Sequence, residues 1–249
     1  MPSLGSHMVR ARRLAAILGL PEIDADRGAF YLGSTAPDIR VITRGDRADT
    51  HFFDLDDLKR QDSVERMLEA HPELRKPAGL DAATTAFIAG FITHLVLDEA
   101  WVEEIYRPTF GIYSEIDADP RSNVWDRVLQ YELDRLDRLD DQTRVDLQGA
   151  LADSAPPPGV PFIEDENLAR WFEMINEVAG LEPDYSRFRP MMMRHLEGAG
   201  FSEHDIDACC ADPSDIVKEA LGVVSQERVD RFWEHAEEIM QERVRRYLR

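Results

Sequence analysis

The run 86–101 constrains the fold of this chain more than any other segment. It reads AFIAGFITHLVLDEAW, which predicts a helix that is apolar on nearly every face. A helix of this kind has to be surrounded by other segments. His94 and Asp98 interrupt it and, four residues apart, project from one face on successive turns. Gly90 lies one turn earlier, where its missing side chain leaves room for a neighbouring segment.

A carboxylate inside such a helix needs a partner, because burying an unpaired charge is costly. Two interpretations of His94 and Asp98 follow from their spacing. They form a hydrogen-bonded pair in the core, or they hold one metal ion between them. These two residues alone do not decide between the alternatives.

The rest of the chain also favours helices. It lacks repeated alternation of apolar and polar residues, and it contains no Asn-Gly or Asp-Gly dipeptide. Apolar residues recur instead at three- and four-residue steps, which predicts an all-α fold. The expected helices are 6–19, 25–33, 62–70, 81–107, 122–152, 164–180, 184–198, 202–211 and 214–248.

The strongest break in the helical pattern is the Pro-rich stretch 153–161. It separates a first part, 1–152, from a C-terminal helical part, 162–249. The second part would be small alone, so we predict that 1–249 forms a single all-α domain.

Charge and cysteine usage narrow the function. The chain has 29 Lys and Arg against 49 Asp and Glu, a net charge of −20, which disfavours long nucleic acids as partners. Its two cysteines, Cys209 and Cys210, are neighbours and cannot form a disulfide framework, which suits a reducing compartment. Arginines interrupt the first twenty residues, where an export signal needs an apolar run. With no apolar run of membrane-spanning length recognised, we expect a cytoplasmic protein.

Three other segments carry side chains that could join His94 and Asp98. Asp38 follows a proline in the segment 33–39, and His51 stands before two phenylalanines. His7 lies near the start of the first helix, in a Gly-Ser-His-Met stretch that we take as native. Singly, a helix cap explains Asp38 and an exposed loop explains His51. Together with the pair in 86–101 they supply three histidines and two aspartates, a donor set suited to zinc.

The order of these pieces resembles the zinc-dependent phospholipase C family, whose relatives include fungal single-strand nucleases. The resemblance runs from His7 to Pro108. It rests on the N-terminal histidine, on Gly33-Ser34-x-Ala36-Pro37-Asp38-Ile39, on His51 before aromatic residues, and on Phe87-x2-Gly90-x3-His94-x3-Asp98-x2-Trp101. It implies an all-α multi-helix bundle with a cluster of up to three zinc ions.

The resemblance also implies a division of the ligands. Asp38, His51, His94 and Asp98 would hold the principal zinc ion, and His7 would hold a second one with Asp98 bridging. The family's remaining zinc uses a further histidine and a His-x3-Glu pair, but this chain has no histidine from 99 to 194. We therefore expect one or two zinc ions and no third site. Carboxylates that could substitute, or that simply face solvent, are Glu103, Glu104, Asp126, Glu132 and Asp134.

The function implied by the resemblance is hydrolysis of a small phosphoester or a phospholipid. Zinc-bound water would attack phosphorus, and Asp38 would orient that water or act as general base. A second hypothesis is a non-catalytic helical protein with a retained structural metal site and an acidic surface that binds a partner. A third is helical packing without metal, which places Asp38 and His51 far from His94.

One other motif has a structural explanation. His204-Asp205 is the dipeptide typical of another class of metal phosphohydrolases. It also lies at a Ser202-x-x-Asp205 helix start. We predict that Asp205 serves as part of a helix cap rather than as a metal ligand.

Overall fold

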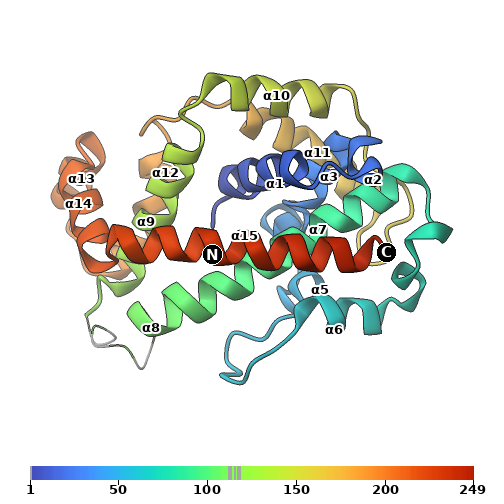
Figure 1. The fold of residues 1–249 in the computed structure, drawn as a ribbon. Helices are drawn as coiled ribbons and strands as arrows, with labels where there is room; N and C mark the ends of the chain where they lie inside the picture. Colours follow the sequence, from blue (N-terminus) through green and yellow to red (C-terminus); the bar gives the residue numbers. More distant parts are fainter. Residues whose placement is uncertain (1, 112–113, 115, 117–118) are drawn as a thin grey trace.

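The computed structural model describes residues 2–111, 114, 116 and 119–249 (Figure 1). The described residues contain helices and no strand, which confirms the predicted all-α fold. In chain order the α-helices are α1 (Leu4–Leu18), α2 (Pro21–Asp24), α3 (Arg27–Gly33), α4 (Arg40–Thr43), α5 (Ala48–His51), α6 (Ser63–Ala70), α7 (Ala82–Trp101), α8 (Arg107–Thr109), α9 (Ser122–Asp137), α10 (Asp141–Ala152), α11 (Asp165–Ala179), α12 (Phe188–Gly198), α13 (Glu203–Ala211), α14 (Ser214–Val223) and α15 (Gln226–Tyr247).

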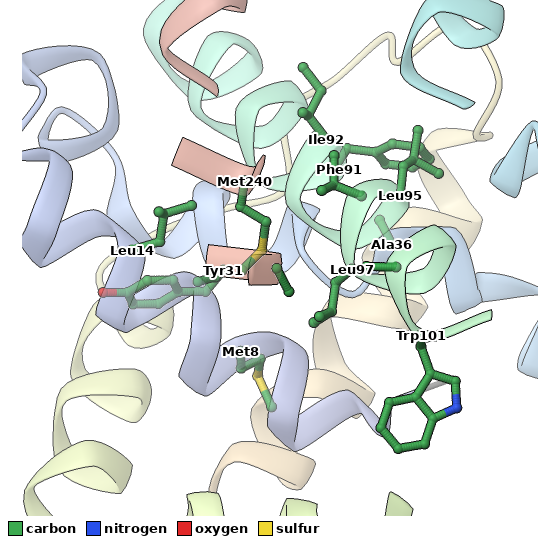
Figure 2. Packing of buried hydrophobic residues seen from close by; sticks show 14 of the residues in the cluster. Met8, Leu14, Tyr31, Ala36, Phe91, Ile92, Leu95, Leu97, Trp101 and Met240 are labelled. Carbon is green, nitrogen blue, oxygen red and sulfur yellow. The ribbon is translucent and has the colours of Figure 1, made fainter. Parts of the chain in front are cut away.

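Helix α7 is the buried centre of the bundle, as its composition requires. Its first turn is fixed by Asp81, whose side chain accepts a hydrogen bond from the backbone N–H of Thr84 at 2.9 Å. Its apolar side chains face several neighbours at once, α1 and α15 among them (Figure 2). At its end the ring of Trp101 meets Phe232 of α15 edge to face, with centroids 5.2 Å apart. Packing on all sides explains why α7 has no polar face.

Helices α3 and α7 approach each other through two glycines. A Cβ atom at Gly33 would lie 2.0 Å from the carbonyl oxygen of Phe87, and one at Gly90 would lie 1.9 Å from that of Phe30. Both distances are far below van der Waals contact, so only glycine fits at these positions. This confirms the close approach expected at Gly90.

Two of the long predicted helices are broken in the structure. The segment 122–152 forms α9 and α10, because Asp140, between them, caps the second helix by accepting from the N–H of Gln142 at 3.2 Å. The segment 214–248 forms α14 and α15, and Ser225 caps the second, accepting from the N–H of Arg228 at 3.3 Å. The three- and four-residue spacing of apolar residues continues past both capping residues. That spacing alone therefore predicted one helix in each segment where the structure has two.

The helix that includes α7 also runs further than predicted. A π-helical turn, Val102–Tyr106, follows α7 and leads directly into α8, which contains Pro108. The wider turn tolerates the proline, which lacks a backbone N–H. The span Ala82–Thr109 is therefore long and apolar enough to cross a membrane, contrary to the expectation from sequence. Because 94% of its apolar window is buried within the fold, it has the character of a core helix.

Helices of the C-terminal part pack against the first part. Helix α15 lies beside α7 (Figure 1), and α14 contacts α9. The Pro-rich break is also anchored, since Ser154 donates a hydrogen bond from Oγ to Asp26 Oδ1 at 2.7 Å. The single domain over 1–249 stays a prediction that these contacts favour.

Candidate metal centre

Five side chains predicted as ligands meet in the interior, although they come from four separate elements. His7 lies on α1, Asp38 on the 3₁₀ turn Ala36–Ile39, His51 at the end of α5, and His94 and Asp98 on α7. This arrangement contradicts the hypothesis of helical packing that keeps Asp38 and His51 away from His94.

Asp98 lies at the centre of the cluster. Its Oδ1 is 3.4 Å from Nε2 of His7. Its Oδ2 is 3.4 Å from Nε2 of His51 and 3.4 Å from Nε2 of His94. Asp38 joins from the other side, with Oδ1 3.4 Å from Nε2 of His51. The rings of His7 and His94 stack with centroids 3.8 Å apart.

The ligand atoms fall into two groups of three. One group contains His7, His94 and Asp98, and the other contains Asp38, His51 and His94; within each, the atoms lie within 4.8 Å of one another. The resemblance assigns His94 to one ion and makes Asp98 the bridge. Here His94 belongs to both groups, while Asp98 touches histidines of both.

The donor atoms that converge on this point make no hydrogen bond. They are Nε2 of His7, Nε2 of His51, Nε2 of His94 and Oδ1 of Asp98. Unpartnered buried polar atoms are rare and destabilising unless something satisfies them. Imidazole nitrogens and carboxylate oxygens aimed at one place are the donor set of zinc, so the residues fit that ion.

Hydrogen bonds behind the rings orient two of the histidines. His94 donates from Nδ1 to the carbonyl oxygen of Ser34 at 2.9 Å. Nδ1 of His51 lies 3.3 Å from Oγ1 of Thr50. Because the Thr50 hydroxyl donates its proton to the carbonyl oxygen of Pro37 at 2.7 Å, Nδ1 of His51 is the donor to Oγ1 of Thr50. With protons on Nδ1, each ring presents the lone pair of Nε2 to the cluster, as metal-binding histidines do.

Burial and charge set the protonation of the cluster in the metal-free protein. Burial lowers the pKa of His7 to about 4, and burial also lowers the pKa of His51. Burial acts against the charged form of His94 too, but the Asp98 carboxylate outweighs it and raises the pKa of His94. A metal ion binds neutral imidazole, so it would compete with protonation of His94.

Asp38 differs from the other four in its access to solvent. Its side chain is 22% exposed, whereas that of Asp98 is 4% exposed and the three histidines are fully buried. Burial acts to raise the pKa of Asp38, but its contact with Nε2 of His51 and the charge of His94 outweigh it and lower the pKa to about 2. Asp38 is thus an ionised carboxylate at the open side of the cluster.

Arg47 belongs to the cluster and was not predicted from the sequence. It precedes α5, and its Nη2 donates to Oδ2 of Asp98 at 3.1 Å while Nη1 donates to the carbonyl oxygen of Phe53 at 3.1 Å. Its side chain is 12% exposed. The motif pieces did not include it, and no spacing rule connects a loop arginine to an aspartate on a distant helix.

Most of the five carboxylates considered as substitute ligands for a third zinc site bind other side chains. Asp126 accepts from Nε1 of Trp101 at 3.1 Å, Glu132 binds Arg135, and Asp134 binds Arg138. None of the five, which also include Glu103 and Glu104, belongs to a group of potential metal ligands among the described residues.

Comparison with known protein families supports zinc as the ion that the ligand cluster would hold. Residues 6–101 match the family model described as zinc dependent phospholipase C. Over this segment the chain is similar to that family. It contains all five clustered residues and covers less than half of the chain. No curated protein and no solved structure matches the chain.

The start of the matched segment fits its surroundings closely. The N–H of Ser6 donates to Oδ1 of Asp134 at 2.8 Å, and a Cβ atom at Gly5 would lie 2.4 Å from that same oxygen. These contacts are in keeping with a native Gly5–Met8 stretch. The prediction for Asp205 is also confirmed, because it forms a capping box with Ser202.

Proposed function

We propose that this protein is a zinc-dependent phosphoester hydrolase of the phospholipase C type. The observation that carries the proposal is the convergence of unpartnered His7, His51, His94 and Asp98 atoms inside a segment that matches this family. Asp38 completes the donor set from the open side.

In this proposal each residue of the cluster has a defined task. His51, His94 and Asp38 hold one ion, and His7 with Asp98 holds a second. Zinc held by these residues would supply a nucleophile at neutral pH, by lowering the pKa of water to about 7, and would stabilise negative charge on the phosphoryl oxygens. The chain keeps Nε2 of each histidine aimed inward and excludes bulk water from four of the five ligands.

Asp38 is the residue that faces the substrate. A carboxylate with a pKa of about 2 is a weak proton acceptor at neutral pH, because general bases work best with a pKa near the working pH. We therefore assign Asp38 to holding zinc and orienting water through a hydrogen bond, in preference to proton abstraction.

The substrate is proposed to be a small phosphoester or a phospholipid, and the location the cytoplasm. The net charge of −20 repels long nucleic acids, whereas the ions provide local positive charge for one phosphoryl group.

The second candidate is a structural metal site in a helical protein that binds a partner through its acidic surface. It is favoured by the near-complete burial of His7, His51, His94 and Asp98. A structural zinc site is closed by protein ligands, whereas a catalytic one keeps an open position. The 22% exposure of the Asp38 side chain favours the catalytic alternative.

Zinc content and hydrolysis of bis(p-nitrophenyl) phosphate, measured on the same samples, test the proposal. Wild type and His204→Ala should both bind zinc and turn over, since His204 is exposed on α13. His94→Ala and Asp38→Asn should lose turnover, and His94→Ala should also lose zinc. Zinc without turnover on any phosphoester would support the structural site. Absence of zinc after reconstitution with excess metal would refute both proposals.

A further inference from the structure

Phe52, the residue directly after the ligand His51, has a left-handed backbone conformation. Its φ is 52° and its ψ is 23°, and its N–H donates to the carbonyl oxygen of Ala48 at 3.3 Å, which ends α5 immediately after His51. Glycine adopts this conformation readily, but a Cβ atom makes it unfavourable. Of the described residues other than glycine, only Phe52 and Arg44 have a positive φ. Surrounding contacts therefore have to hold Phe52 in this conformation.

Two other rings hold the ring of Phe52. Phe162 meets it nearly edge to face, with centroids 5.6 Å apart and an interplanar angle of 83°. His71 meets it with centroids 5.9 Å apart at an angle of 80°. Phe162 and His71 also contact each other, with centroids 4.9 Å apart. These three rings in mutual contact, which we call the aromatic clamp, fix the direction of the Phe52 side chain.

The aromatic clamp is anchored to the helix that carries two of the ligands. The ring of Phe162 meets that of Phe91 with centroids 5.0 Å apart. Phe91 is fully buried on α7, three residues before His94. Phe162 follows the Pro-rich break and lies outside the segment that matches the family model. The C-terminal part thus contacts both the helix that carries His94 and the residue that follows His51.

His51 depends on its neighbour more than His94 does. His94 lies in the middle of the 20-residue helix α7, whose backbone fixes its direction. His51 is the last residue of the four-residue helix α5, so the conformation of Phe52 decides where the chain turns away. Nε2 of His51 lies 3.4 Å from a carboxylate oxygen of Asp38 and 3.4 Å from one of Asp98. The turn after His51 therefore has to place its ring toward two other ligands at once.

We infer that Phe162 is a positioning residue of the metal centre: through Phe52 it holds the left-handed turn that directs His51 at the cluster. The inference rests on the zinc centre of the proposed function and adds to it a residue from outside the matched segment. Without the aromatic clamp, Phe52 would relax to a negative φ in the metal-free protein, and zinc binding would have to restore the strained turn. The C-terminal part of the chain therefore helps to set the affinity for zinc.

Zinc affinity of the full-length protein, measured by competition with a chromophoric chelator, tests the inference at Phe52. Phe52→Val keeps an apolar side chain, but its branched Cβ opposes a positive φ, so zinc should bind at least about 10-fold more weakly. Phe52→Gly removes the ring but adopts the left-handed conformation freely, so its zinc affinity should stay within about 3-fold of wild type. If Phe52 only filled space, glycine would be the more harmful substitution, and that order would overturn the inference.

Phe162→Ala tests the aromatic clamp itself. It should weaken zinc binding about 10-fold in the wild-type background. In the Phe52→Gly background, where no strained side chain remains to be held, it should weaken zinc binding by less than about 2-fold. Phe201→Ala removes another half-buried phenylalanine of the C-terminal part and should bind zinc like wild type.

Thermal melting of each variant shows whether it is folded and so separates the outcomes. An equal loss of zinc affinity from Phe162→Ala in both backgrounds, in folded protein, would overturn the inference and leave the zinc centre intact. So would a zinc affinity that Phe162→Ala does not change in either background. A wild-type protein that binds no zinc would refute the proposed function and this inference together.

Discussion

At the scale of single residues, the ligand cluster destabilises the metal-free protein. The Nε2 atoms of three histidines and one carboxylate oxygen are buried without hydrogen bonds. Each such atom costs about 1–3 kcal/mol of desolvation. Bound zinc would satisfy them, so the cluster couples folding to metal binding.

Removal of zinc should therefore lower stability measurably. With free zinc at 100 times its dissociation constant, the folded state gains about 2.7 kcal/mol, provided the unfolded chain does not bind the ion. We expect thermal melting to shift upward on addition of zinc and back on addition of a chelator. The melting temperature of His204→Ala should shift like that of wild type. A wild-type melting temperature that changes with neither zinc nor the chelator would contradict this coupling.

The hydrogen bond between Nδ1 of His51 and Oγ1 of Thr50 should also affect the affinity for zinc. Thr50→Val removes the Oγ1 that accepts from His51 Nδ1 while preserving side-chain shape. We expect zinc to bind at least about 10-fold more weakly, as is usual when such a supporting partner is lost. Competition with a chromophoric chelator measures this. Thr109→Val, at another buried threonine, is the matched control, and equal affinity in both variants would argue against an orienting role for Thr50.

The residues that could be predicted from the sequence were those in short, ordered motifs. His94 and Asp98 share a helix face, and Asp38 and His51 stand in recognisable local contexts. Arg47 and the supporting oxygen of Ser34 were missed for a physical reason. Their contacts with Asp98 and His94 exist only after α5 and α3 have packed on α7.

At the scale of elements, the close crossing of α3 and α7 positions the site. Gly33 and Gly90 let the two backbones touch, and the same crossing brings the carbonyl of Ser34 to His94. Periodicity predicted both helices, but it could not predict the breaks at Asp140 and Ser225, where a polar cap outcompetes a continuing apolar pattern.

Substitution at the crossing should destabilise the fold and disturb the site together. Gly90→Ala forces a Cβ against the carbonyl of Phe30, and we expect a loss of about 3 kcal/mol in the free energy of unfolding with weaker zinc binding. Gly149→Ala is the control, because a Cβ atom added at this position on α10 would have nothing within 4 Å. It should gain about 0.5–1 kcal/mol. Denaturant titration measures both, and similar stability of the two variants would contradict the proposed crossing.

At the scale of the whole molecule, the C-terminal part packs on the helix that carries the site. Helix α15 contacts α7, and within the first part α9 supplies Asp134 to the start of α1. The family match ends at residue 101, so beyond that point a helical pattern was the only guide to this arrangement.

Phe232→Ala tests whether the two parts form one cooperative unit. Phe232 is buried against Trp101, and its truncation should cost about 3–5 kcal/mol. For a single domain, the whole unfolding transition moves to lower denaturant and stays single. Val145→Ala, at an exposed position, should change stability by less than about 0.5 kcal/mol. Two transitions, of which Phe232→Ala moves only one, would show two domains.

The most direct test of the zinc centre is zinc K-edge X-ray absorption of the reconstituted protein. We predict nitrogen and oxygen ligands at about 2.0–2.2 Å, with weaker imidazole scattering in His94→Gln and an altered oxygen shell in Asp98→Asn. A sulfur ligand at about 2.3 Å would instead point to Cys209 or Cys210 and contradict the assigned ligands. So would a zinc spectrum that neither substitution alters.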